Sequence, residues 1–136
     1  MKLKMMICTL FLAFSSVLLA AEDYQLSTHV LDTTLGKPGQ GVVVTLEKRN
    51  MKGEWVVVGS KTTNEDGRIG SFLERGEAVS HVGVYRFTFQ LANYFQKQGK
   101  TTVFPEAVII FNIDSDEHYH IPLVVTPYAL STYRGS

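Results

Sequence analysis

The sequence has a single cysteine, Cys8, among its 136 residues. It also lacks an excess of either charge, because 13 lysines and arginines balance 13 aspartates and glutamates. A balanced charge gives no basic field with which to neutralise the phosphates of a nucleic acid. Disorder is excluded as well, since 45% of the residues are hydrophobic. The length fits one globular domain and is too short for two substantial ones.

The first 21 residues are predicted to be a secretory signal peptide. A short basic start precedes an apolar run from Met5 to Phe14, and small and aliphatic residues follow. We expect cleavage after Ala20 or Ala21, which leaves residues 22–136 as one mature domain in the periplasm. The alternative is a membrane anchor, because the apolar run approaches the roughly 17 residues that a spanning helix needs.

Cleavage also removes Cys8, so the mature chain contains no cysteine. An exported protein without cysteine forms no disulfide, and it has no thiolate to act as a nucleophile or as a zinc ligand. Its stability must therefore come from a packed core, with oligomerisation as a further source.

The mature chain is predicted to be all-β. From Leu26 onward, short stretches rich in Val, Ile, Thr, Phe and Tyr are separated by glycine, proline or charged turns, which is typical of strands. Eight short strands in one small domain indicate an antiparallel sandwich. One segment, Ala92 to Gln98, is predicted to be helical, with Asn93 as its N-cap and Gly99 at its end. The expected strands are Leu26 to Asp32, Gly41 to Arg49, Trp55 to Thr62, Arg68 to Phe72, Gly83 to Leu91, Ala107 to Ile113, His118 to Thr126 and Leu130 to Tyr133.

Alternation within the strand His118 to Thr126 predicts which side chains face the core. Successive side chains of a strand point to opposite faces of the sheet. His118 and His120 then lie together on the outer face, toward solvent or a partner subunit. The opposite set is more apolar and is predicted to face the core: Tyr119, Ile121, Leu123 and Val125.

Four histidines are candidates for chemistry in the mature chain. His118-Tyr119-His120 is an H-x-H on a strand, a spacing that can place two imidazoles on one metal ion. A zinc site needs a third ligand, for which the sequence offers His29 or a carboxylate without diagnostic spacing. His81 lies in a predicted loop and is expected to be solvated. The sequence has no G-x-S-x-G nucleophile elbow and no glycine-rich phosphate loop.

Two further segments have an ordinary structural explanation when they are considered alone. Arg68 directly follows the Asp66-Gly67 turn, where a solvated turn residue is expected. Ser131 to Ser136 form the end of the chain, where fraying is common.

Three stretches of the mature chain carry a family resemblance. They are HVLDTTLGKPG at His29 to Gly39, DGRIG at Asp66 to Gly70, and HYHIPLVVTPYALSTYRGS, which ends at Ser136. Together they resemble the transthyretin-related family, specifically its 5-hydroxyisourate hydrolases, and the terminal YRGS is the most specific of them. The resemblance covers essentially the whole mature chain and implies the family's sandwich of two four-stranded sheets with one short helix. Two departures are Thr126, where serine is usual, and Ala129-Leu130, where Gly-Tyr is more common.

The resemblance implies an enzyme of purine degradation that hydrolyses 5-hydroxyisourate, the unstable product of urate oxidation. Water attacks a ring carbonyl and opens the amide bond, which gives a carboxylated ureido-imidazoline. No metal or other cofactor is expected, because the substrate carbonyl is already electrophilic. The alternative is a transthyretin-like carrier that binds a small ligand without chemistry. His29, Arg68, His120 and the YRGS tail argue against the carrier, because they mark the enzyme branch of the family.

Three residues are predicted to be catalytic, namely His29, Arg68 and His120. We expect the two imidazoles to orient and deprotonate the water, since a neutral ring with an ordinary pKa of about 6.5 takes a proton near neutral pH. The guanidinium of Arg68 is expected to hold urea-like oxygens and to offset negative charge on the attacked carbonyl. The predicted substrate-binding residues are His29, Arg68, Tyr133, Arg134 and Ser136.

The resemblance also implies a homotetramer, a dimer of dimers, whose central channel holds the active sites at the subunit interface. A polar sheet face becomes a binding surface once a second subunit covers it. Two alternatives stay open for His118, which either lines the pocket or takes a supporting or solvent-exposed position.

Overall fold

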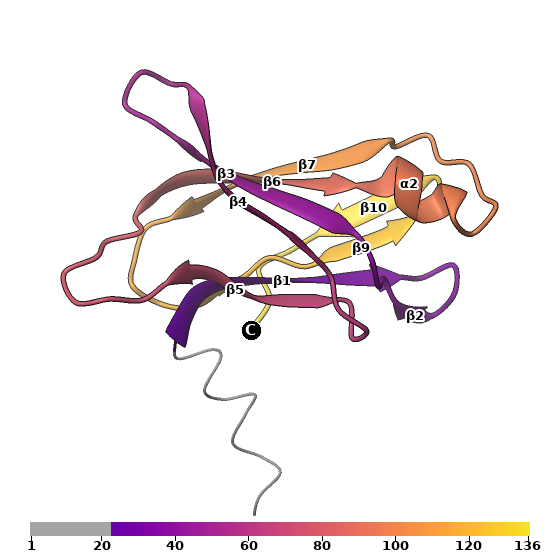
Figure 1. Ribbon diagram of the computed structural model, residues 1–136, viewed down its shortest axis with the longest axis horizontal. Coiled ribbons are helices and arrows are strands. Elements are labelled where there is room, and N and C mark those ends of the chain that lie inside the picture. Colours follow the sequence, from indigo (N-terminus) through magenta and orange to yellow (C-terminus); the bar gives the residue numbers. More distant parts are fainter. Residues whose placement is uncertain (1–22) are drawn as a thin grey trace, which may run out of the picture.

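Two β-sheets face each other in the computed structural model, which describes residues 23–136 (Figure 1). The predicted signal peptide, residues 1–21, lies outside the described residues. Within the described part of the chain, no helix has the length and apolar character needed to cross a membrane. The elements are β1 (Tyr24–Asp32), β2 (Lys37–Pro38), β3 (Val43–Arg49), β4 (Trp55–Thr62), β5 (Arg68–Glu74), β6 (Gly83–Gln90), α2 (Leu91–Gln96), β7 (Glu106–Ile113), β8 (Tyr119–His120), β9 (Leu123–Thr126) and β10 (Ala129–Thr132).

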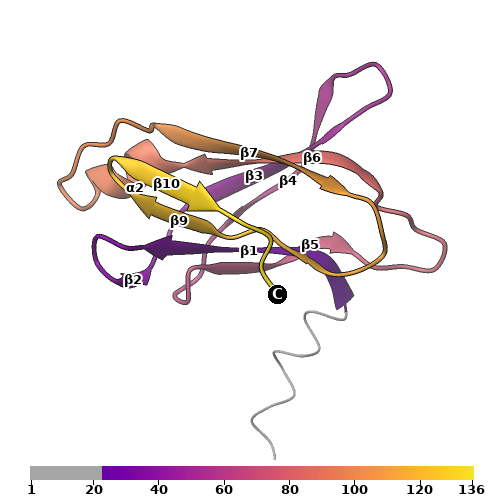
Figure 2. The ribbon, with the colours of Figure 1, turned by 180° about the vertical axis from the view of Figure 1, so that it is seen from behind.

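The first sheet has the strand order β4-β3-β6-β7, and all its neighbouring strands are antiparallel. The second sheet is organised around β1, which pairs with β2, β5, β8 and β9, while β10 pairs with β9 (Figure 2). The predicted sandwich of two sheets with one short helix is therefore confirmed for the described residues. The central position of β1 means that its side chains have neighbours on both sides.

The second sheet differs from the prediction in two respects, because it has six strands rather than four and it is not wholly antiparallel. β1 pairs in parallel with β8 and β9, with Ser27 opposite His120 and Val30 opposite Leu123. No hairpin connects these strands. The chain crosses to the other sheet and returns before it pairs with β1 again, and a connection of that length allows a parallel pair.

The strand predicted from His118 to Thr126 is divided into β8 and β9. Pro122 lies at the break, and proline has no N–H with which to continue a ladder of hydrogen bonds. Ile121 stays attached to β1, because its N–H donates to the Ser27 carbonyl (3.1 Å) and its carbonyl accepts from the Thr28 hydroxyl (2.7 Å). The alternation continues across the break, and the predicted core face is confirmed by the burial of Tyr119, Ile121, Leu123 and Val125.

The helix begins one residue earlier than predicted and ends two residues earlier. Its N-cap is Gln90, which makes no side-chain capping bond, so the prediction of Asn93 as the N-cap is wrong. The carbonyl of Pro105 accepts from the backbone N–H groups of Leu91 and Ala92, at 3.0 and 2.9 Å. A neighbouring loop therefore satisfies the free N–H groups that a capping side chain normally binds.

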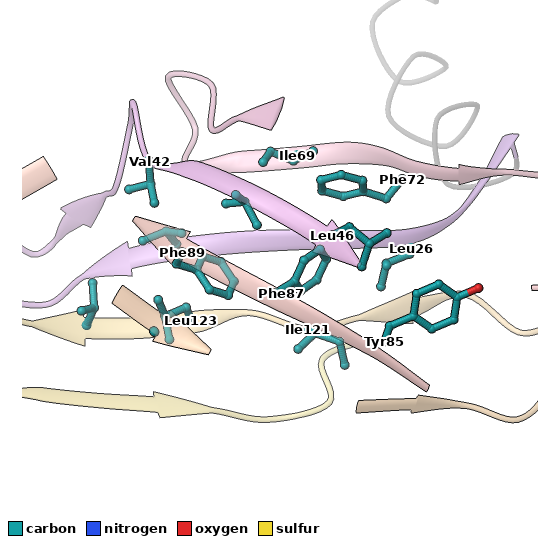
Figure 3. Close-up of a cluster of buried hydrophobic side chains, with 14 of the residues drawn as sticks. Leu26, Val42, Leu46, Ile69, Phe72, Tyr85, Phe87, Phe89, Ile121 and Leu123 are labelled. Atoms are coloured by element: carbon teal, nitrogen blue, oxygen red, sulfur yellow. The ribbon is translucent and has the colours of Figure 1, made fainter. Parts of the chain in front are cut away.

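The core lies between the two sheets and is rich in aromatic side chains (Figure 3). Alternate residues of β6 point inward, and among them Phe87 is fully buried. The Phe87 ring centroid lies 5.3 Å from that of Phe72 on β5 and 5.1 Å from that of Phe111 on β7. The contact with Phe72 joins the two sheets across the sandwich, whereas the contact with Phe111 lies within the β4-β3-β6-β7 sheet. The inner face of the β1 sheet is therefore packed against the core, and its outer face is free for a site.

Candidate active site

The two faces of β1 differ in chemistry. Leu26, Thr28 and Val30 are fully buried and face the core. Because side chains alternate along a strand, Ser27 and His29 project from the opposite, outer face of the same sheet. Both are half-buried. The alternation of core-facing and outward-facing residues along this nine-residue strand thus places His29 on the surface away from the core.

The neighbouring strands bring Arg68 and His120 to this outer face. Arg68 on β5 lies directly opposite His29, and His120 on β8 lies directly opposite Ser27. Directly paired residues project from the same side of a sheet. The structure therefore gathers the three predicted catalytic residues from strands that are far apart in the sequence. The C-terminal end of the chain lies on this same side of the sheet in both views (Figures 1 and 2).

A tight turn positions Arg68 beside His29. The Asn64 side-chain carbonyl accepts from the backbone N–H groups of Asp66 and Arg68, at 3.0 and 2.9 Å. Gly67 has a φ of +71°, and a Cβ at this position would come within 2.5 Å of the Val30 carbonyl oxygen. Only glycine fits such a position. The turn packs against β1 through this glycine, and Arg68 begins the next strand at a fixed register.

Ser27 joins two histidines by hydrogen bonds. Its Oγ lies 2.7 Å from Nδ1 of His120 and 2.9 Å from Nε2 of His118. The other ring nitrogen of His118, Nδ1, lies 3.0 Å from the backbone carbonyl oxygen of Tyr24. His118 is thus held between Ser27 and the Tyr24 carbonyl, and of the two alternatives considered from the sequence these contacts favour the supporting position, which stays a prediction. Ser27 was not a candidate in the sequence, because no motif marks it and its partner His120 lies 93 residues away.

The charge of Arg68 acts on both imidazoles of the site. Partial burial lowers the pKa of His29 below 6.5, and the Arg68 guanidinium lowers it further, while Asp66 opposes the shift. Burial also lowers the pKa of His120 to about 4, with further contributions from Arg68, His29 and His118. Burial and a nearby cation both penalise the imidazolium form. Both rings are therefore neutral at physiological pH and are able to accept a proton.

The end of the chain is attached to His120 through Gly135. The Gly135 N–H donates to the His120 carbonyl at 2.8 Å, which forms an isolated antiparallel bridge. Arg134 is turned to Glu117, with Nη2 2.9 Å from the carboxylate, and its guanidinium lies 4.4 Å from the ring centroid of Tyr119. Tyr133 and Ser136 are exposed. The structure thus places the tail beside the site, and substrate contacts from Tyr133, Arg134 and Ser136 stay a prediction.

The structure also bears on His81 and on the metal site that His118 and His120 could form. His81 lies between β5 and β6, where its Nε2 is 2.8 Å from the Glu74 carbonyl oxygen. Among residues 23–136, no three or more His, Cys, Asp or Glu side chains are arranged to hold a metal ion. The described residues therefore do not supply the third ligand that a zinc site on His118 and His120 needs.

Known proteins resemble this chain over most of its length. The 5-hydroxyisourate hydrolase of Salmonella dublin is 40% identical over 125 residues, which are 91% of this chain and 90% of that protein. A solved structure of 5-hydroxyisourate hydrolase from Klebsiella pneumoniae superposes with a TM-score of 0.69 at 34% identity, covering 83% of this chain and 99% of that one. The similarity therefore extends over the strands that carry the candidate site.

A longer protein contains a similar sandwich. The crystal structure of an (S)-allantoin synthase superposes with a TM-score of 0.74 at 36% identity, covering 84% of this chain. This chain spans only 44% of the allantoin synthase chain. The family model described as HIUase/Transthyretin family matches residues 26–135, from Leu26 within β1 to Gly135 beside His120. The fold, the strand register of His29, Arg68 and His120, and these similarities all agree. The chain belongs to the HIUase/Transthyretin family.

Proposed function

We propose that this protein hydrolyses 5-hydroxyisourate to the ring-opened carboxylate by attack of water on a ring amide carbonyl. The observation that carries this proposal is the position of His29, Arg68 and His120 on one outer face of the β1 sheet. A neutral imidazole beside a permanent cation suits the attack of water on a carbonyl, because one group takes a proton and the other stabilises negative charge. The names of the similar hydrolases support the same substrate.

The reaction needs a base for the water and a donor for the oxygen that becomes negative. An imidazole of the His29 and His120 pair takes the proton as the water oxygen bonds to the carbonyl carbon. The Arg68 guanidinium, which carries several donors in a fixed plane, binds the developing oxyanion. The C–N bond of the ring then breaks, and the proton passes from the imidazole to the departing ring nitrogen. Water is consumed, and the enzyme returns to its starting state.

The proposal includes a homotetramer, built as a dimer of dimers, whose subunits cover this face. Arg68 is exposed in the single chain, and Tyr133 keeps 58% of its surface accessible. A covering subunit would exclude bulk water and strengthen the electrostatic interactions within the site. Sedimentation of the mature protein measures the assembly directly, and a monomer at working concentration would contradict this part of the proposal.

Location in the periplasm is likewise part of the proposal. It rests on the basic start, the apolar run and the small residues that precede Glu22. Fractionation of cells that express the full chain, followed by mass spectrometry of its N-terminus, tests it. A periplasmic product that begins at Ala21 or Glu22 supports the proposal. An uncleaved product in the membrane fraction supports the anchor instead.

The activity is tested by following the ultraviolet decay of 5-hydroxyisourate that urate oxidase has freshly generated. Because the substrate decays unaided, rates with and without untagged mature protein are compared. His120→Asn is expected to abolish the acceleration, whereas His81→Asn, a matched change outside the site, is expected to keep it. A folded protein that binds the substrate or a related ring saturably without accelerating its decay would support the carrier and contradict the hydrolase.

A further inference from the structure

A continuous chain of hydrogen bonds runs behind His120, from a backbone carbonyl to its ring. The Tyr24 carbonyl oxygen lies 3.0 Å from His118 Nδ1, and His118 Nε2 lies 2.9 Å from Ser27 Oγ. Ser27 Oγ lies 2.7 Å from His120 Nδ1. These three contacts involve two histidines and one hydroxyl, each of which can bind in more than one direction. One end of the chain, however, is fixed.

When both rings are neutral, the carbonyl at that end determines the direction of every other bond. A carbonyl oxygen only accepts, so the hydrogen on His118 must be on Nδ1. A neutral imidazole carries one hydrogen, and His118 Nε2 is therefore an acceptor for the Ser27 hydroxyl. Ser27 has one hydrogen to donate, so its oxygen accepts from His120 Nδ1–H. Neutral His120 is then left with an unprotonated Nε2.

We propose that Ser27 and His118 are positioning residues that hold His120 as its Nδ1–H tautomer, so that His120 Nε2 is the atom that removes the proton from water. This inference deepens the proposed hydrolysis and rests on it. It also separates the two histidines of the site, because it assigns the base to His120. His29 then orients the water or the substrate beside it.

The geometry of the tail agrees with this assignment. An added Cβ at Gly135 would lie 2.5 Å from His120 Cδ2, the ring carbon bonded to Nε2. The Cδ2 side of the ring therefore lies toward Gly135 in the C-terminal tail, while Nδ1 is occupied by Ser27. The lowered pKa of His120 keeps the ring in the neutral form on which the tautomer argument depends.

Removal of Ser27 or of His118 is expected to change which ring nitrogen of His120 carries the hydrogen. In Ser27→Ala, His120 Nδ1 has no partner, and the ring is free to carry its hydrogen on Nε2, where it cannot act as a base. In His118→Phe, the Ser27 hydroxyl has lost its acceptor and is free to donate to His120 Nδ1, which favours the inactive tautomer. Ser27→Thr keeps a hydroxyl and suits a β-strand, so it is expected to restore the relay.

The direct test is nitrogen NMR of histidine side chains in the mature protein, recorded at about pH 8, where free imidazoles are neutral. The wild-type His120 signal, identified by its loss in His120→Asn, is expected to show protonated Nδ1 and unprotonated Nε2. Ser27→Ala and His118→Phe are expected to move it toward the Nε2–H form, and Ser27→Thr to keep it. A wild-type Nε2–H ring, or a tautomer unchanged in both disruptive variants, would overturn the proposal.

Kinetics supply the second readout. Ser27→Ala is expected to lower kcat by roughly 10-fold or more with little change in KM, because an enzyme whose base is in the wrong tautomer loses rate rather than binding. Ser27→Thr is expected to recover most of this loss, and Ser60→Ala in the other sheet serves as the control. Because the NMR experiment needs no substrate, a protein with the expected tautomer and no hydrolysis contradicts the proposed function, whereas normal hydrolysis with the other tautomer contradicts only the relay.

Discussion

Gly135 and His120 are in contact so close that no side chain fits between them. The Gly135 N–H donates to the His120 carbonyl at 2.8 Å, and a Cβ at position 135 would lie 2.5 Å from His120 Cδ2. Separations below about 3 Å force one partner to move, and here the partner is the ring assigned as the base. The glycine of the terminal YRGS therefore has a steric purpose that can be tested by substitution.

Gly135→Ala is expected to lower kcat by roughly 10-fold or more, because a small displacement of a base or of the groups around it is costly to the rate. The free energy of unfolding should change little, since the tail lies outside the core. The decay assay and thermal melting measure the two effects. Gly59→Ala is the matched control, because its added Cβ has no atom within 4 Å. An active Gly135→Ala variant would show that the contact does not matter for catalysis.

Arg68→Gln is expected to have two effects that arise from one lost charge. Turnover should fall by roughly 100-fold or more, the scale for losing a group that stabilises an oxyanion. The pKa values of His29 and His120 should rise, because the Arg68 guanidinium lowers both. An NMR titration of the variant measures the second effect without substrate. Unchanged histidine pKa values would mean that the guanidinium does not lie against these rings in solution.

The pH dependence of activity follows from the lowered pKa of His120. Because protonation removes the base, kcat/KM should decline as the pH falls through a value well below the ordinary histidine pKa of about 6.5. With the pKa of His120 lowered to about 4, activity should persist to about pH 5, after correction for unaided decay. An acidic limb centred at or above the ordinary pKa would contradict His120 as the base.

Stability is expected to depend on pH through the same ring. The unfolded chain binds a proton near the ordinary histidine pKa of about 6.5, whereas folded His120 binds one only at about 4. The unfolded state therefore holds more protons between these values, and the free energy of unfolding should decrease as the pH falls from the higher to the lower. Urea titrations at several pH values measure this slope. The slope should be smaller in His120→Asn.

Asp32→Ala is expected to affect the fold rather than the chemistry. Asp32 is fully buried and accepts from the Tyr94 hydroxyl at 2.8 Å and from the Thr34 N–H at 3.0 Å. The variant leaves these donors without their acceptor, which should cost roughly 2 to 3 kcal/mol of the free energy of unfolding. Denaturant titration measures the loss, and the folded fraction should keep its kcat. A stable but inactive variant would place Asp32 in the reaction instead.

Much of the fold could be predicted from local patterns, and the reasons are visible in single strands. Period-two alternation in His118 to Val125 predicted the buried side chains, because burial on one face of a strand is a local property. The break at Pro122 was missed although proline carries the signal for it. The parallel pairing of β1 with β9 was not predictable in this way, since it depends on a path through the other sheet.

The candidate site, like the fold, could be predicted from the sequence only in part. His29, Arg68 and His120 were predicted through the resemblance, and their proximity follows from strand register that no local pattern contains. Ser27 has no motif of its own, and its importance appears only when β8 lies beside β1. The prediction of the helix N-cap was wrong for a related reason. The carbonyl that accepts from the first N–H groups of the helix belongs to Pro105, in a distant loop that no local capping rule includes.

The alternation of β1 has a consequence for how such proteins diversify. Its inward residues hold the sandwich together, while its outward residues bear the polar groups of the site, and the two sets share no positions. Substitutions at Ser27 or His29 therefore leave the packing between the sheets intact. One scaffold is in this way free to gain or lose a chemical activity without having to evolve a new architecture.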